Sequence, residues 1–531
     1  MTQTTNKDPL DMNNYRIEQL PNRPKSRFER WMAYAGAPLS IVVFVLLYKC
    51  IDIPFLNNIN TENLTGDALK RFNDTGIAEF CRINYAMLAI FAASVILWIT
   101  EAIPNYLTSL LVIAAIVLTG ITSEKTAYAQ LGHPVMWLNI LSFVLASMLV
   151  KTQVAKRFAL WFVVHFGKNA TRIFISFIVI NIVLSAFISA TTAKAAILLP
   201  VFMVIAAIYG ATGGNNKNNF GRNIVLQNLF QINIGASGFM TGSGANLLAV
   251  SIIMGAGVTF GYQEWFVAAF PLCLLIIIIG WTVGTKIIFP LKKEERLPQI
   301  EGGMLRLKEE LHKMGSMKIS EYKAIAIFVG VLFMWATKGY LHNISETTVA
   351  FMGAVLALIP FGIGIVKWND IDIPWHLMIF SAGAYTLGAG LDATNIAGTM
   401  VDSAFNSLGI SNDTPFWILY LMLTGAMLFS AILFQSKTMR ALIFIPIAIG
   451  VAQKFGYPVM SLAFPVALLI EHVYVLPFNS KPAALLYTTD QYSWADTFKF
   501  GITMMIISWI IMFVWGKTVL QWLGYVPDGL F

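Results

Sequence analysis

Apolar segments about 20 residues long recur along almost the whole sequence, and they constrain the fold more than any other feature. A helix needs roughly 20 apolar residues to cross a bilayer, and shorter apolar runs beside Gly, Ser or Pro suit re-entrant hairpins or half-helices. Hydrophobic residues make up 57% of the 531 residues, charged residues only 12%, and the mean hydropathy is +0.68. A soluble domain has about a quarter charged residues. The sequence therefore predicts an all-α polytopic membrane protein with about 11 transmembrane helices and two further re-entrant hairpins.

The net charge of +8 does not indicate a nucleic-acid partner. The basic residues cluster in the N-terminal tail and in the central stretch 291–323, which contains eight Lys and Arg. Such clustering is typical of the excess positive charge in cytoplasmic segments of membrane proteins. We therefore expect a multi-pass protein of the plasma (inner) membrane, with a cytoplasmic N-terminus and an external C-terminus.

The apolar pattern divides into two halves separated by the polar stretch 291–323. In that stretch Met304, Leu307 and Leu311 recur at helical spacing, which predicts an interfacial helix near 303–314. The expected segments are a cytoplasmic tail (1–33), a first transmembrane helix and external loop (34–83), repeat 1 (84–290, with a hairpin at 136–167 and a broken helix at 173–209), the cytoplasmic linker (291–323), repeat 2 (324–520, with a hairpin at 374–400 and a broken helix at 415–454) and an external tail (521–531).

The sequence shows no arrangement of residues that is typical of an enzyme active site. The six histidines and three cysteines have no metal-ligand spacing, and no nucleophile–base set stands out. We therefore expect a protein that is not an enzyme, with no cofactor and no resident metal.

Three short blocks occur in the same order in both halves. LVKTQVA (149–155), ATTAKAAILLP (190–200) and FMTGSGANLLAV (239–250) are similar to LDATNIA (391–397), SKTMRALIFIP (436–446) and LPFNSKPAALLY (476–487). An odd number of spans in each repeat would give the halves opposite topology, and inverted repeats with interrupted helices indicate a secondary transporter. The helix that restarts after a break presents free N–H groups and a positive dipole end, which suit a carboxylate.

The stretches around these blocks resemble the divalent anion:sodium symporter family. The resemblance is carried by WITEAIPNYLTSLLVIAAIVLTGI (98–121), PVMWLNILSFVLASMLVKTQVAKRFALWFV (134–163) and DIPWHLMIFSAGAYTLGAGLDATNIA (372–397). It implies di- and tricarboxylate substrates, and a transport domain that moves like an elevator against a scaffold domain, which forms a homodimer. It also implies a Ser-Asn-Thr motif in each half that faces the substrate, paired with a Gly-Thr-Pro-Pro-Asn-like loop that helps to bind sodium.

Both motifs are altered in this sequence. The first triplet, at 190–192 or at 189–191 with a shift of one residue, lacks the Asn, and the second has Lys437 in its place. The loop at 241–246 keeps its Gly and its last Asn, whereas the loop at 479–483 has lost both. By position, the resemblance implies that the substrate-binding residues are Ser189, Ala190, Thr191, Thr192, Gly242, Ser243, Asn246, Ser436, Lys437, Thr438, Ser480, Lys481 and Pro482.

Lys437 and Lys481 are candidates to replace sodium with a tethered ammonium group. A buried lysine without an anion is costly, and a bound dicarboxylate would satisfy it. This reasoning predicts sodium-independent exchange, because an empty carrier with an uncompensated charge crosses the membrane poorly. The alternatives are that the stem of Lys437 carries its ammonium to a polar loop, and that sodium still binds at Thr191, Ser243 and Asn246.

Other charged residues in the apolar segments can be explained by structural roles. Lys194 and Arg440 occupy matching positions in the two halves and either attract anions or form structural ion pairs. We expect Glu471 and His472 to lie at the edge of a solvated cavity.

The favoured function is exchange of dicarboxylates such as succinate, malate, fumarate and 2-oxoglutarate. The alternatives are a sodium-coupled di- or tricarboxylate symporter and, from another class, an organic anion channel.

Overall fold

A computed structural model describes most of the chain. The described residues are 8–15, 27–53, 56, 64, 66–214, 216–300, 302–360, 362, 364–371, 373–394, 396, 414–434, 436–477 and 479–531.

Helices are the regular structure of the described residues, which contain no β-strand beyond two isolated bridges. Before the central linker the helices are α1 (Arg27–Val45), α3 (Gly66–Thr100), α4 (Asn105–Leu118), α5 (Glu124–Ala129), α6 (Pro134–Lys151), α7 (Val154–Phe166), α8 (Ala170–Phe187), α9 (Thr191–Ile208), α10 (Asn219–Ser237), α11 (Gly244–Gly255) and α12 (Tyr262–Val283). The linker contains α13 (Gly303–Lys313), and after it come α14 (Ile319–Thr337), α15 (Glu346–Leu358), α16 (Trp375–Thr394), α18 (Phe416–Phe429), α19 (Lys437–Lys454), α20 (Val459–Leu468), α21 (Lys481–Tyr487) and α22 (Trp494–Trp515).

Eight helical stretches among the described residues are long and apolar enough to cross a membrane. Five further apolar helices have 10–17 residues, which suits half-spans better than full spans. The prediction of an all-α polytopic membrane protein is confirmed, whereas the total of about 11 transmembrane helices stays a prediction.

Each half contains an interrupted helix within an apolar stretch of the chain. In the first half α8 ends at Phe187 and α9 begins at Thr191, with extended backbone at Ile188 and Ala190. In the second half α18 continues into a short 3₁₀ turn, Ser430–Ile432, and α19 begins at Lys437. The two restarting helices also match in sequence, because each carries a proline in its tenth position, Pro200 and Pro446.

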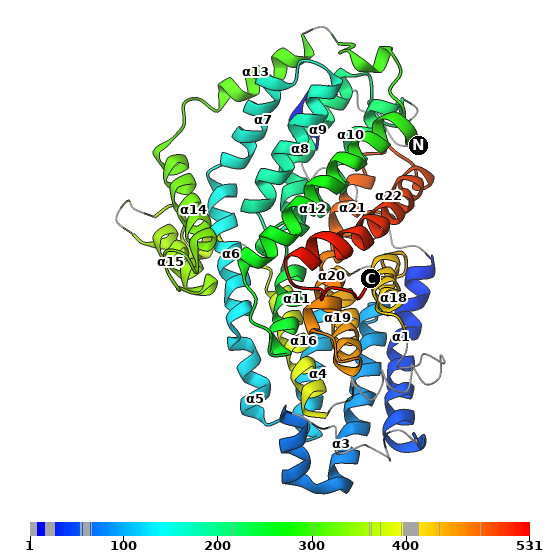
Figure 1. Cartoon of the computed structure of the whole chain (residues 1–531). Helices are drawn as coiled ribbons and strands as arrows, with labels where there is room; N and C mark the ends of the chain where they lie inside the picture. Colours follow the sequence, from blue (N-terminus) through cyan, green and yellow to red (C-terminus); the bar gives the residue numbers. More distant parts are fainter. Residues whose placement is uncertain are drawn as a thin grey trace.

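Residues 136–167, where the first hairpin is expected, form α6 and α7, which a left-handed residue, Gln153 (φ 60°), connects. The two helices follow each other lengthwise in Figure 1 and do not lie side by side, so the hairpin stays a prediction. The second begins with α16, but residues 395 and 397–400 of the expected range 374–400 lie outside the described residues, as do 1–7 and 16–26 of the expected N-terminal tail.

The two halves pack against each other reciprocally (Figure 1). Helix α6 of the first half packs on α15 of the second, and helix α16 of the second packs on α4 of the first. Likewise α9 packs on α21, and α19 packs on α11. Contacts that pair element i with j and j with i are typical of a two-fold relation between the packed units. The tips of the interrupted helices are thereby brought together from both halves.

The central linker lies at one end of the molecule, at the top of Figure 1, where α13 packs on α7 and α9. Arg157 of α7 fixes this region by donating to Glu321 of α14 (Nε–Oε2 2.6 Å) and to the carbonyls of Met314 and Gly315.

Candidate functional site

Four helix N-termini converge through the reciprocal packing, those of α9, α11, α19 and α21. Serine hydroxyls cap three of them: Ser243 accepts from the backbone N–H of Asn246, Ser436 from that of Met439 and Ser480 from that of Ala483. Ser243 and Ser480 have almost the same backbone conformation, with φ, ψ of −156°, 156° and −156°, 159°. The positive dipole ends of these helices make the region favourable for an anion.

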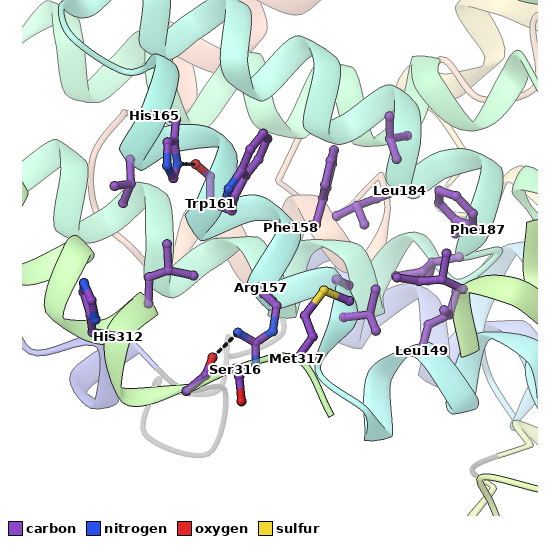
Figure 2. Close-up of a pocket in the computed structure, with 18 of the residues that line it drawn as sticks. Leu149, Arg157, Phe158, Trp161, His165, Leu184, Phe187, His312, Ser316 and Met317 are labelled. Carbon is purple, nitrogen blue, oxygen red and sulfur yellow. Dashed lines mark hydrogen bonds between the residues drawn. The ribbon is translucent and has the colours of Figure 1, made fainter. Parts of the chain in front are cut away.

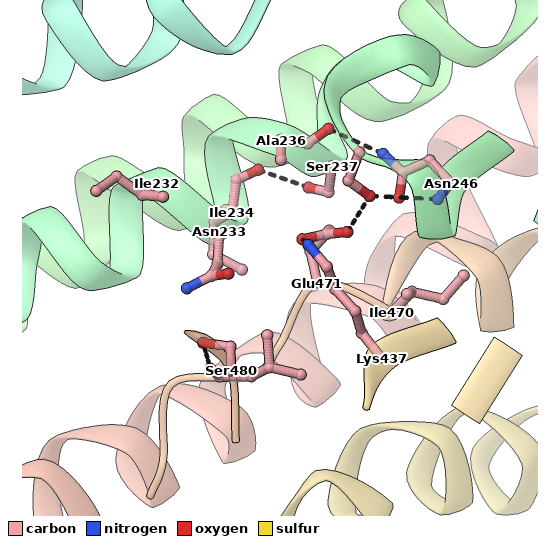
Figure 3. Close-up of polar contacts among 12 residues, drawn as sticks. Ile232, Asn233, Ile234, Ala236, Ser237, Asn246, Lys437, Ile470, Glu471 and Ser480 are labelled. Atoms are coloured by element: carbon pink, nitrogen blue, oxygen red, sulfur yellow. Dashed lines mark hydrogen bonds and ion pairs between the residues drawn. The ribbon is translucent and has the colours of Figure 1, made fainter. Parts of the chain in front are cut away.

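Glu471 connects the two halves at this point. Its Oε2 accepts from Lys437 Nζ at 2.7 Å, and its Oε1 accepts a short hydrogen bond from the hydroxyl of Ser243 (Figure 3). Lys437 is the first residue of α19, whereas Ser243 is the cap of α11 in the other half. A cation at a helix N-terminus is unfavourable with respect to the helix dipole. The carboxylate of Glu471 offsets both this effect and the burial of the ammonium group.

The expectation that Glu471 and His472 lie at a solvated edge is wrong. Glu471 has 0% exposed surface and His472 1%. Both lie in the irregular segment between α20 and α21, so no helical periodicity indicates how deeply they are buried. The charge of Lys437 is consequently compensated by Glu471 in the empty protein, so the expectation of an uncompensated lysine is wrong at this position.

Two further buried cations occupy the fourth positions of the restarting helices. Lys194 donates to Ser185 Oγ (2.8 Å) and to the carbonyl of Ile232 (3.2 Å). Arg440 donates to Ser430 Oγ (2.9 Å) and to the carbonyls of Ile470 (3.1 Å) and Met427. Both have 0% exposed surface, and no salt bridge to either is found among the described residues. Each is close enough to Glu471 to interact with it electrostatically.

The expected site residues occupy different environments. Ser243 and Lys437 meet through Glu471, whereas Lys481 is exposed and its Nζ lies 3.5 Å from His376 Nε2. Ala190, Thr192, Ser436, Thr438 and Ser480 are half-buried, and Ser189, Thr191, Gly242, Asn246 and Pro482 are buried.

Asn246 holds its own loop in place. Its Nδ2 donates to the carbonyls of Ala236 (2.9 Å) and Phe239 (3.0 Å). Its Oδ1, together with Thr241 Oγ1 and Ser189 Oγ, is buried without a hydrogen-bond partner among the described residues. These oxygens can accept from a ligand or coordinate a cation. The groups that could hold a small ion are therefore oxygen atoms, and the described residues contain no cluster of His, Cys, Asp and Glu that would bind a metal.

Comparison with known protein families matches residues 80–526 to the sodium:sulfate symporter transmembrane region. This match covers most of the chain, and the chain belongs to this family of transporters, the divalent anion:sodium symporters that the sequence resembles.

Individual relatives are distant. The sodium-dependent dicarboxylate transporter SdcS of Staphylococcus saprophyticus is 24% identical over 453 residues, which cover 80% of this chain and 85% of the relative. A membrane protein of Cupriavidus necator is 25% identical over 464 residues, covering 83% and 88%. Among solved structures, the Alcanivorax borkumensis YdaH transporter aligns with 92% of this chain and 97% of its own at 11% identity and a TM-score of 0.47.

Proposed function

We propose that this transporter exchanges C4 and C5 dicarboxylates, such as succinate, malate, fumarate and 2-oxoglutarate, without coupling to sodium. The observation that carries the proposal is the charge balance where the four helix N-termini meet. Lys194, Lys437 and Arg440 are three cations, and Glu471 is the one carboxylate that a described residue contributes to this cluster. The formal excess of two positive charges matches a dicarboxylate dianion.

The same balance supports exchange. Glu471 neutralises one cation in the empty protein, but the remaining excess sits in a region of low dielectric constant, where uncompensated charge is costly. A bound dianion removes the excess, so the loaded carrier should reorient more readily than the empty one. In sodium-coupled relatives the cations come from solution, whereas here they are tethered to the chain.

The reciprocal packing of the halves supports two inverted repeats, with the site at their interface. We extend the proposal to an elevator mechanism in a scaffold-mediated homodimer and to a cytoplasmic N-terminus with an external C-terminus, as the family resemblance and the charge distribution imply.

A sodium-coupled symporter is the second candidate, and one observation favours it. The buried oxygens of Thr241, Asn246 and Ser189 that lack partners among the described residues are of the type that hard cations bind. The name of the SdcS relative also includes sodium dependence.

Counterflow in proteoliposomes distinguishes the two candidates. Vesicles with and without internal succinate are tested for uptake of labelled succinate in the presence and absence of sodium. The proposal predicts uptake that requires internal dicarboxylate and continues without sodium. Uptake that needs sodium and no internal substrate would overturn it. Lys437→Asn should abolish sodium-free exchange, and Lys517→Asn, an exposed lysine far along the chain, should leave it intact.

A further inference from the structure

A cavity of about 800 Å³ lies away from the proposed substrate site, between α7, α8, α13 and α14 (Figure 2). Its volume is in the range of cavities that enclose a whole small molecule. Trp161 and Ile325, which line it, are 44% and 36% exposed, so the cavity opens on an apolar surface. Because α8 and α14 are candidate membrane spans, we expect this surface to face lipid.

The two ends of the cavity differ chemically. His165 and His312 lie at one end of the view in Figure 2, and Leu149, Leu184 and Phe187 lie toward the other. Lys308, which also lines the cavity, precedes His312 by four residues on α13 and therefore shares its face of the helix. One end is basic and the other is hydrocarbon-like.

The ionisable residues that line the cavity are basic. Four of its residues are Arg, Lys or His, and none of the described lining residues is Asp or Glu. Arg157 is already satisfied by Glu321 and by two carbonyl groups. Lys308 has no such salt bridge among the described residues, and His312 adds a second donor beside it.

We propose that this cavity binds one anionic glycerophospholipid, with its phosphate at Lys308 and His312 and an acyl chain along α8 and α14. A basic entrance attracts anionic lipid, at roughly 1 kcal/mol for each Lys or Arg near the surface, and the apolar lining accommodates hydrocarbon. α13 is placed for this role, because its apolar face packs on the protein while it leads into the membrane-spanning α14.

The cavity also reaches the first helix break. Ile188 lines it and belongs to the short connection to α9, in which Ile188 and Ala190 have extended backbone. A bound acyl chain would therefore pack against the backbone that positions the tip of α9. The lipid site does not depend on which anion the protein transports.

Native mass spectrometry of the purified full-length protein tests the proposal. Phosphatidylglycerol and phosphatidylcholine with the same acyl chains are titrated separately. We expect one tightly bound phosphatidylglycerol per chain, and about fivefold weaker binding in Lys308→Gln, the effect of one lost surface charge. Lys293→Gln removes the same charge from an exposed residue that does not line the cavity, and it should leave this binding unchanged.

A second variant tests the hydrocarbon part of the site. Ile325→Trp fills space on the α14 side of the cavity from a residue that is already partly exposed, and it should weaken the binding of phosphatidylglycerol. Equal binding of the two lipids, equal affinities in Lys308→Gln and Lys293→Gln, or unchanged binding in Ile325→Trp would each overturn the proposal.

Discussion

Replacing Glu471 by Gln is the sharpest test of the contact between the two halves. The substitution keeps the size of the side chain but removes the charge that faces Lys437 at 2.7 Å. Breaking a buried ion pair by removing one partner costs about 3–5 kcal/mol, because the other charge is left uncompensated. Glu471 has no exposed surface, but the Lys437 side chain is 18% exposed and keeps some hydration. We therefore expect Glu471→Gln to lower the free energy of unfolding by about 3 kcal/mol, the lower end of that range.

Equilibrium unfolding by SDS in mixed micelles, followed by tryptophan fluorescence, measures this loss. The matched control is Glu79→Gln, which breaks an ion pair with Arg82 of almost the same length, 2.6 Å. In that pair the side chains are 44% and 42% exposed, so the expected loss is only about 0–1 kcal/mol.

The double variant Glu471→Gln, Lys437→Gln should recover most of the stability, because it removes both charges of the pair and returns the cluster to the net charge of the unchanged protein. If Glu471→Gln destabilises the protein no more than Glu79→Gln does, the buried pair does not hold the halves together and our reasoning is wrong.

Two other predictions concern positions outside this ion pair. Gly242→Ala should strongly reduce both stability and transport, because a Cβ there would lie 2.2 Å from the carbonyl oxygen of Ala236, whereas Gly255→Ala, which meets nothing within 4 Å, should be tolerated in the same unfolding and uptake assays. The hydrogen bond from Lys151 lowers the pKa of Asp370, so the stabilising contribution of this exposed carboxylate is present above its unfolded pKa of about 3.9 and is lost as the pH falls below it. Asp370→Asn should therefore lower the SDS midpoint slightly at neutral pH and have no effect in strong acid, and an undiminished difference in acid would contradict this assignment.

The positions of many helices could be predicted from local signals. The stretches 173–209 and 415–454, where broken helices are expected, contain the two interruptions that the structure shows, and the helix expected at 303–314 contains all of α13. These features depend on apolar run length, on Ser and Pro near a helix start and on helical spacing, all of which are properties of neighbouring residues.

The sequence by itself determined that this chain is an all-helical membrane protein of a transporter family with two similar halves, because hydropathy and short motifs are local. Only the tertiary structure decided what surrounds each cation. The hydrogen bond from Ser243 to Glu471 joins residues 228 positions apart, and no local pattern encodes such a contact. Glu471 lies in an irregular segment where periodicity does not indicate burial, so its pairing with Lys437 depends on how α11 and α19 pack. For the same reason, only the packing of α7, α8, α13 and α14 shows that His165 and His312, far apart in the sequence, share one cavity.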